Sequence, residues 1–210
     1  MDLHSLPPEA LALAAALLGY LIGSLSFAVI VSQLFGLNDP RTYGSGNPGA
    51  TNVLRSGNKK AAILTLLLDA LKAYLPVLAA RHVGLDDTTV TAVGLGAFLG
   101  HLWPVFFKFE GGKGVATAAG ALLGFDPAMG GLVLLVWLGM AVVFRYSSLA
   151  ALTASLAAPV LQWHFHCIGP MFHGVLVMSA LLIWRHESNI RKLLAGQESK
   201  LGQKAAPTQP

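Results

Sequence analysis

Hydrophobic residues occur along this chain in long runs that short polar stretches separate. The runs cover residues 9–35, 61–80, 89–107, 115–125, 128–144, 149–166 and 168–184. Most of them have the roughly 20 residues that a helix needs to cross a hydrocarbon core about 30 Å thick. The pattern therefore predicts an all-α integral membrane protein, with residues 1–194 as its membrane domain.

The distribution of charge predicts the topology. The polar segments 36–60, 108–114, 145–148 and 185–210 hold 12 of the 14 Lys and Arg residues. The other polar stretches contain Asp2, Glu9, Asp86, Asp87 and Asp126, with Arg81 as their only basic residue. Because basic loops stay cytoplasmic, we expect the N-terminus outside, the C-terminus inside and an odd number of spans. Seven transmembrane helices satisfy this parity if the short run at 115–125 is counted.

Composition supports a membrane protein. Hydrophobic residues make up 54% of the chain and charged residues 11%, with a mean hydropathy of +0.62. A soluble domain has about 25% charged residues. No basic residue precedes the first apolar run, so we expect a retained helix over 9–35 rather than a signal peptide. Cys167 is alone, which excludes an intrachain disulfide, and the polar tail at 195–210 is expected to be disordered.

The first candidate binding loop is YGSGNPGATNVLR at 43–55. Its glycines allow close backbone approach, and Ser45, Asn47 and Thr51 add donors beside the backbone N–H groups. Arg55 could bind a phosphate with two hydrogen bonds. An ordinary turn between two helices is the alternative interpretation.

The second candidate loop lies in HLWPVFFKFEGGKGVAT at 101–117. Gly111, Gly112 and Gly114 surround Lys113, and an apolar helix is expected to follow at once. Glycine amides leading into a helix N-terminus favour anions, and the lysine adds a point charge. The alternative is a basic turn that serves only topology.

Two further polar segments follow later helices. Ser148 belongs to Arg145–Ser148, and His186 and Asn189, three residues apart on one helical face, belong to the segment 185–191. Charge topology places both segments on the side of the two loops. We therefore expect a single site for phosphorylated substrates on that side.

These motifs together resemble the bacterial acyl-phosphate:glycerol-3-phosphate acyltransferase family (PlsY family). The matching segments are SGNPGATNVLR at 45–55, HLWPVFFKFEGGKGVAT at 101–117, RYSSLA at 145–150 and RHESNIRKL at 185–193, with GSLSFA at 23–28. The resemblance implies a seven-helix inner-membrane enzyme whose active site faces the cytoplasm. Such an enzyme transfers a fatty acyl group from acyl phosphate to the sn-1 hydroxyl of glycerol 3-phosphate, giving lysophosphatidic acid and phosphate for phospholipid synthesis.

The resemblance also implies roles for individual residues. Ser45 and Arg55 would be essential in the first loop, and Gly111, Gly112, Lys113 and Gly114 would hold the acyl phosphate. Ser148, His186 and Asn189 would complete the site. The bilayer and two small substrates are the implied partners, without a cofactor, a metal or nucleic acid. Ala73, where the family often has glycine, is a departure that concerns helix packing.

Because an acyl phosphate is already activated, we expect direct transfer without a covalent acyl-enzyme. His186 and Glu187 are the nearby candidates for a general base, but we favour a substrate phosphate as proton acceptor with His186 orienting groups. Asp69 lies inside a span, where a carboxylate is costly. We expect it to pair with Lys72 at i+3.

Two other patterns are rejected on topology and residue type. His82 and Asp87 match the H-x4-D spacing of another acyltransferase class, but they fall on the outer side. A metal site is not expected from the outer cluster, which holds no carboxylate: His164, His166, Cys167 and His173.

Two other functional classes remain open from the residues alone. A small anion transporter would need its cations at a midplane cavity between helices. A scaffold for anionic headgroups would need only basic residues.

Overall fold

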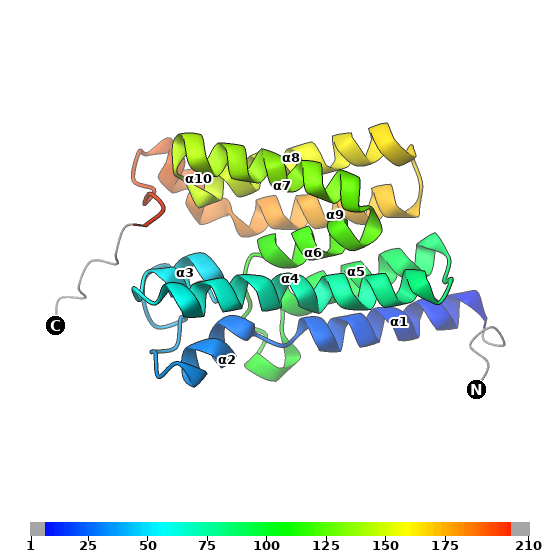
Figure 1. Ribbon diagram of the computed structural model, residues 1–210, viewed down its shortest axis with the longest axis horizontal. Coiled ribbons are helices and arrows are strands. Elements are labelled where there is room, and N and C mark those ends of the chain that lie inside the picture. The colour runs from blue at the N-terminus through cyan, green and yellow to red at the C-terminus, as the bar shows by residue number, and fades with distance from the viewer. Residues whose placement is uncertain (1–6, 203–210) are drawn as a thin grey trace.

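The computed structural model describes residues 7–202, and every regular element in that range is helical (Figure 1). This agrees with the expected all-α class. Asp2, Lys204 and the end of the tail at 203–210 lie outside the described residues. In chain order the elements are α1 (Pro8–Gly23), α2 (Phe27–Leu34), α3 (Ala50–Leu54), α4 (Lys59–His82), α5 (Asp87–Leu102), η2 (Val105–Phe107), α6 (Val115–Phe125), α7 (Pro127–Phe144), α8 (Ser147–His166), α9 (Pro170–Arg185) and α10 (Glu187–Leu194).

Four helical segments of the described chain are long and apolar enough to cross a membrane. They are Pro8–Leu34, Lys59–His82, Asp87–Phe107 and Pro127–Phe144. The expected seven spans would need α6, α8 and α9 as well, so the number of spans and the orientation stay predictions. The run at 115–125 is indeed short. It forms α6, which has 11 residues and begins only after the glycine loop at 103–114.

Local sequence explains where several helices begin. The Asn58 side chain accepts from the backbone N–H of Ala61 at the start of α4. Asp86 and Asp126 cap α5 and α7 in the same way, each accepting from two backbone N–H groups. Such caps satisfy donors that the first turn of a helix leaves unpaired. The capping residues therefore fix the turns between the long apolar runs.

The first apolar run is not one helix, and the prediction of a continuous helix over 9–35 was wrong. The chain leaves helical geometry after α1 and resumes it at α2, with residues 24–26 between them. Ser24 donates its hydroxyl to the carbonyl of Tyr20 at 2.8 Å, a local bond that competes with helix continuation. The Leu25 carbonyl, which the break releases, accepts from Lys72 Nζ at 2.8 Å. Hydropathy could not reveal this break, because the interruption is short and lies between apolar residues.

Glycines on α1 and α5 allow these two helices to pack backbone against backbone. A Cβ at Gly23 would collide with the carbonyl oxygen of Ala97 on α5, and a Cβ at Gly96 would collide with the carbonyl oxygen of Ala16 on α1. Small residues that permit such approach are typical of helix pairs in membranes. The closely packed α1–α5 pair therefore lies beside the start of the glycine loop, which follows α5.

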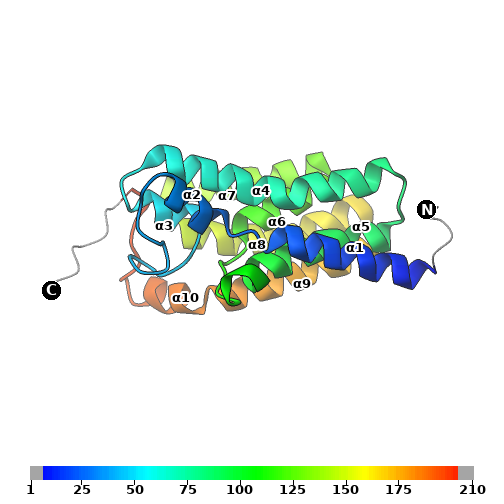
Figure 2. The same ribbon diagram turned by 90° about the horizontal axis from the view of Figure 1, so that it is seen from below.

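The helices lie side by side, and the polar connections gather at one end of the bundle (Figures 1 and 2). The segment around α2 and α3, the α7–α8 turn and α10 lie at this end. The α4–α5 and α8–α9 turns lie at the other end, as does α1 where the described chain begins. Segments that are distant in sequence therefore meet at one end.

We expect Gly96→Ala to destabilise the protein, because the added methyl group has no room against α1. Overpacking of this kind costs about 1–3 kcal/mol. Thermal unfolding in detergent measures the effect. Gly139→Ala on α7 is the matched control, since a Cβ there meets nothing within 4 Å. Equal stability of the two variants would contradict close α1–α5 packing.

Candidate active site

A cavity of about 750 Å³ extends from the polar end of the bundle between the helices. Its polar lining comes chiefly from the first loop, α3, the glycine loop, α8, α10 and the tail, with Asp69 of α4 and His101 of α5, and most of the remaining lining is apolar. The polar residues at the mouth include Asn47, Thr51, Lys113, Ser148, His186, Asn189 and Glu198. The apolar lining includes Ile63, Leu67, Ala119, Leu123, Val133 and Trp137.

Lys113 is the central cation of the mouth. Its ammonium donates to Asn189 Oδ1 on α10. Asn189 in turn donates through Nδ2 to Glu198 Oε1 at 2.8 Å. The buried hydroxyl of Ser148 donates to the same carboxylate oxygen, also at 2.8 Å. The structure thus brings together three residues that the sequence placed in separate motifs.

The environment of Lys113 lowers its pKa to about 8. Burial is the largest cause, because it penalises the charged ammonium. The cations Arg185, Lys192 and Arg55 lower the pKa as well, whereas the Glu198 carboxylate raises it. The mouth therefore holds an excess of positive charge that a bound phosphate would offset.

The glycine loop, defined as residues 103–114, is held from two sides. Arg185 Nη2 donates to the carbonyls of Gly111 at 2.8 Å and Gly112 at 3.1 Å. The Gly112 N–H donates to the carbonyl of His101 at 3.1 Å. A Cβ at Gly111 would collide with that same His101 carbonyl. Gly114 has a φ of +86°, a left-handed conformation that suits glycine where the loop enters α6.

A buried asparagine that the sequence analysis did not select organises the first loop. Asn52, 1% exposed, donates to the Pro40 carbonyl at 2.6 Å and the Tyr43 carbonyl at 3.1 Å. Its Oδ1 accepts from the backbone N–H of Ser45 at 3.0 Å. Gly44 has a φ of +60°, and a Cβ there would collide with this oxygen. The only signal in the sequence was an amide inside the quoted motif.

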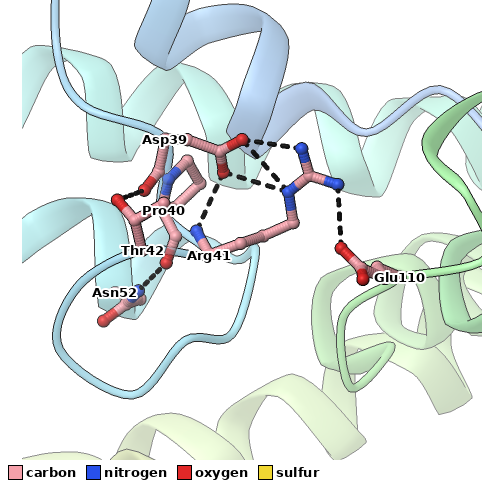
Figure 3. Close-up of polar contacts among 6 residues, drawn as sticks. All are labelled: Asp39, Pro40, Arg41, Thr42, Asn52 and Glu110. Atoms are coloured by element: carbon pink, nitrogen blue, oxygen red, sulfur yellow. Dashed lines mark hydrogen bonds and ion pairs between the residues drawn. The ribbon is translucent and has the colours of Figure 1, made fainter.

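Figure 3 shows the residues just before the first loop, where charged side chains connect them to the glycine loop. Arg41 forms an ion pair with Asp39 at 2.7 Å and with Glu110 at 3.2 Å. The Glu110 side chain is 67% exposed, so the second pair adds little stability. It does link the two loops at the surface of the site.

Four expected site residues lie beside the cavity rather than in its lining, as far as the described residues show. Ser45 is exposed at the tip of the first loop, and Arg55 donates to Ser199 Oγ at 2.5 Å. Gly111 and Gly112 directly precede Lys113 in the glycine loop, where their carbonyls contact Arg185. Thr51, by contrast, lines the cavity and lies 3.2 Å from the hydroxyl of Ser147.

The two candidate bases differ in placement. His186 is 3% exposed and lines the cavity, and its Nδ1 lies 2.8 Å from the carbonyl of Leu182. Burial is the main cause that lowers the pKa of His186 to about 4, so the ring is neutral at pH 7. Glu187 has a 63% exposed side chain that pairs with Arg191 on the outer surface. Of these two residues, only His186 therefore faces the cavity.

The tail contributes to the site, whereas the sequence analysis placed residues 195–210 in a disordered segment. Within the described part, Glu198 lines the cavity mouth and Ser199 accepts from Arg55. The Leu201 N–H donates to the Arg145 carbonyl at 2.7 Å. The polar composition of the segment gave no hint that its carboxylate faces Lys113.

The rejected patterns lie away from this mouth. The α4–α5 turn, which carries His82 and Asp87, is at the opposite end of the bundle (Figures 1 and 2). His166 Nε2 pairs there with Asp126 Oδ2 at 2.7 Å, so the outer histidines do have a carboxylate neighbour, which was not expected. Among residues 7–202, no group of three or more His, Cys, Asp or Glu is placed to hold a metal.

The expected ion pair inside α4 is confirmed. Lys72 Nζ lies 2.8 Å from Asp69 Oδ1, and both side chains are at most 3% exposed. His101 joins them from α5, with Nδ1 2.9 Å from the Lys72 ammonium. His101 belongs to the motif at 101–117, but no role for it was predicted from the sequence.

The chain is similar to known proteins of one family over most of its length. Residues 13–196 match the family described as glycerol-3-phosphate acyltransferase. The chain is 61% identical over 194 residues to a glycerol-3-phosphate acyltransferase of Burkholderia lata, covering 91% of this chain and 92% of the relative. It is 62% identical over 195 residues to the protein of the same name from Burkholderia cenocepacia, with the same coverage.

Two solved structures are similar in fold. One is the glycerol 3-phosphate form of PlsY (YgiH), an integral membrane glycerol 3-phosphate acyltransferase, with a TM-score of 0.86 and 42% identity over 91% of this chain and 96% of that chain. The other is the lysophosphatidic acid form, with a TM-score of 0.83 and 40% identity over 90% and 94%.

We expect Glu198→Gln to lower the pKa of Lys113 below its value of about 8, because the substitution removes the anion that favours the ammonium. Reductive methylation with ¹³C-formaldehyde and an NMR titration in detergent measure this pKa, with Lys113→Arg identifying the signal. Glu187→Gln is the matched control, since it removes a carboxylate that pairs on the outer surface. An unchanged or raised pKa in Glu198→Gln would contradict the contact.

Proposed function

The chain belongs to the glycerol-3-phosphate acyltransferase family, and we propose that it takes the acyl group from an acyl phosphate and places it on the sn-1 hydroxyl of glycerol 3-phosphate. As a member of this family it is an acyltransferase and a membrane protein. The proposal adds the donor, the position of transfer and a mechanism without a covalent acyl-enzyme. The products would be lysophosphatidic acid and inorganic phosphate.

The observation that carries the proposal is one cavity with a cationic mouth and an apolar body. Lys113 and Asn189 lie at the mouth, and Leu67, Leu123 and Trp137 line the deeper part. Leu67 on α4 is 53% exposed on the surface of the bundle, so the apolar part opens sideways between helices. An acyl chain could enter there from the bilayer while its phosphate lies at Lys113.

The proposed chemistry is a direct displacement. The sn-1 oxygen attacks the carbonyl carbon, the bond from that carbon to the phosphate oxygen breaks, and phosphate leaves with the electron pair. Lys113 and the glycine-loop amides would stabilise the charge that develops on the leaving phosphate. Arg55, near the tail, would balance the second phosphate. Holding both substrates side by side can lower the barrier by about 7–11 kcal/mol in favourable cases.

A substrate phosphate is the preferred proton acceptor. The pKa of His186 is about 4, whereas the second pKa of a phosphate monoester is about 6. The phosphate is therefore the stronger base at neutral pH. His186, whose Nδ1 faces the Leu182 carbonyl, leaves Nε2 to accept a hydrogen bond from the acceptor hydroxyl and orient it.

The membrane placement completes the proposal. The mouth of the cavity, α10, the α7–α8 turn and the basic segment around α2 and α3 share one end of the bundle (Figures 1 and 2), and the positive-inside rule assigns such segments to the cytoplasm. We propose seven spans in a bacterial inner membrane, with α6, α8 and α9 completing the four long segments. The soluble substrate would then reach the mouth from the cytoplasm.

We expect the purified protein to release phosphate from acyl phosphate only when glycerol 3-phosphate is present. Phosphate release and the formation of lysophosphatidic acid would be followed together in detergent. Lys113→Met should abolish both, because it removes the central cation. Replacing acyl phosphate with acyl-CoA should give no product. Transfer from acyl-CoA, or no dependence on glycerol 3-phosphate, would contradict the proposed reaction.

Ala119 on α6 tests the apolar part of the cavity. Ala119→Phe should lower kcat/KM for palmitoyl phosphate relative to octanoyl phosphate, because the ring takes space that the longer chain needs. Loss of burial for two methylene groups, at about 0.8 kcal/mol each, corresponds to about tenfold. Leu135→Phe on the exposed face of α7 is the matched control. Equal effects on both donors would place the acyl chain elsewhere.

A further inference from the structure

Two interruptions of helical structure meet at one buried cluster. One is the break between α1 and α2, where the Leu25 carbonyl has no helical partner. The other is the start of the glycine loop, directly after the end of α5, where His101 contacts Lys72 near the middle of α4. In an apolar surrounding each released backbone group needs a partner. Asp69, Lys72 and His101 lie at this meeting point.

Lys72 is the centre of the cluster. Its ammonium contacts the Leu25 carbonyl at 2.8 Å, Asp69 Oδ1 at 2.8 Å and His101 Nδ1 at 2.9 Å. An ammonium offers three donors and no acceptor. The ammonium is therefore hydrogen-bonded to the Leu25 carbonyl and to His101, and its contact with Asp69 is an ion pair, so its partners come from three different segments. The side chain is 1% exposed, so these contacts form without competition from water.

The lysine also fixes the state of the histidine. Because Lys72 can only donate, His101 Nδ1 must accept, and the ring proton of a neutral His101 lies on Nε2. Asp69 Oδ1 is 3.6 Å from the same Nδ1, too far for a hydrogen bond. The opposite edge of the ring faces the glycine loop, since a Cβ at Gly112 would collide with Nε2. The His101 carbonyl meanwhile accepts from the Gly112 N–H.

We propose that Asp69, Lys72 and His101 form a positioning triad, which sets the depth and orientation of the glycine loop for the phosphate of the acyl donor. This inference rests on the proposed function, in which that loop holds acyl phosphate. His101 and Asp69 both line the cavity, so two members of the triad form part of its wall. Arg185 holds the loop carbonyls from α9, and the triad holds the loop from α4 and α5.

A purely structural ion pair and a positioning triad lead to different expectations for a variant that lacks both charges. Replacing both members of a buried pair with neutral residues of similar size is often neutral for stability. The double variant Asp69→Asn/Lys72→Met leaves no uncompensated charge and is therefore expected to fold. It nevertheless removes the donors that fix His101 and the Leu25 carbonyl. A positioning role predicts a folded protein with a loosened loop.

Hydrogen exchange measured by mass spectrometry in detergent tests this without substrate. In the double variant, exchange in peptides covering residues 103–114 should rise about tenfold, while the peptides of α7 stay unchanged. Gln162→Met is the matched control, because it replaces a buried amide near the far end of α8. Unchanged loop exchange in the double variant, or an equal rise in the control, would overturn the proposal.

Histidine tautomers give a second readout. With ¹⁵N-labelled histidine, His101 should show the Nε2–H tautomer in the unaltered protein and lose that fixed state in the double variant. His101→Asn identifies the signal. A ring that is protonated on Nδ1 in the unaltered protein would overturn the assignment of Lys72 as donor.

Kinetics connect the triad to the reaction. The double variant should lose about 100-fold in kcat/KM, the cost of a small misplacement of reacting groups. Its KM for acyl phosphate should rise while its KM for glycerol 3-phosphate stays within about twofold. Equal changes in both KM values would contradict a role at the glycine loop. If the unaltered protein showed no acyl-phosphate-dependent activity, the proposed function would fail, but the exchange comparison would still decide the positioning role.

Discussion

Backbone that leaves helical geometry inside an apolar bundle must find hydrogen-bond partners within the protein. This constraint shapes the active-site half of the molecule. The carbonyl of Leu25 is satisfied by Lys72, and the carbonyls of Gly111 and Gly112 are satisfied by Arg185. The cations that do this come from α4 and from the end of α9, so each loop is tied to a helix of the bundle. The non-helical backbone of the glycine loop is thus held at a defined position, where its N–H groups could bind a ligand.

Close helix packing is what brings those partners within reach. Gly23 and Gly96 let α1 and α5 approach until the backbones touch, and this places the end of α5 beside the break in the first run. The glycine loop then starts from a fixed point. α6 is short because the residues before Val115 form the glycine loop and not a further helical turn.

The same geometry separates charge from hydrocarbon within one cavity. Lys113, Asn189 and Glu198 form a polar mouth, while Leu123 and Trp137 lie deeper. Because the pKa of Lys113 is about 8, the ammonium is mostly charged at pH 7 and still easily affected by neighbouring charge. Glu198 helps to keep it charged without a substrate. A phosphate at the mouth would strengthen that effect.

Sequence patterns predicted the features that depend on local residue spacing. The all-α class followed from the apolar runs, the Asp69–Lys72 pair from i,i+3 spacing, and the common end of the basic loops from charge sign. They did not predict contacts between distant segments. Asn52 and His101 lie inside quoted motifs, but only the tertiary fold shows which carbonyl or ammonium each one meets. Glu198 was missed because a short polar tail has the same composition whether it is packed or disordered.

The position of the proton follows from comparing the two bases in the mouth. Burial keeps His186 neutral by lowering its pKa to about 4, and it thereby removes the ring as an effective base near pH 7. The same burial makes Nε2 a good hydrogen-bond acceptor that directs a hydroxyl without deprotonating it. In the proposed reaction a substrate phosphate oxygen, whose pKa is about 6 before the cations act on it, would lie nearby and would be more basic. As the bond from the acyl carbon breaks, the leaving phosphate becomes more basic still. In the proposed mechanism, proton transfer to phosphate would therefore be favoured when the attacking oxygen becomes acidic, and no carboxylate base would be needed.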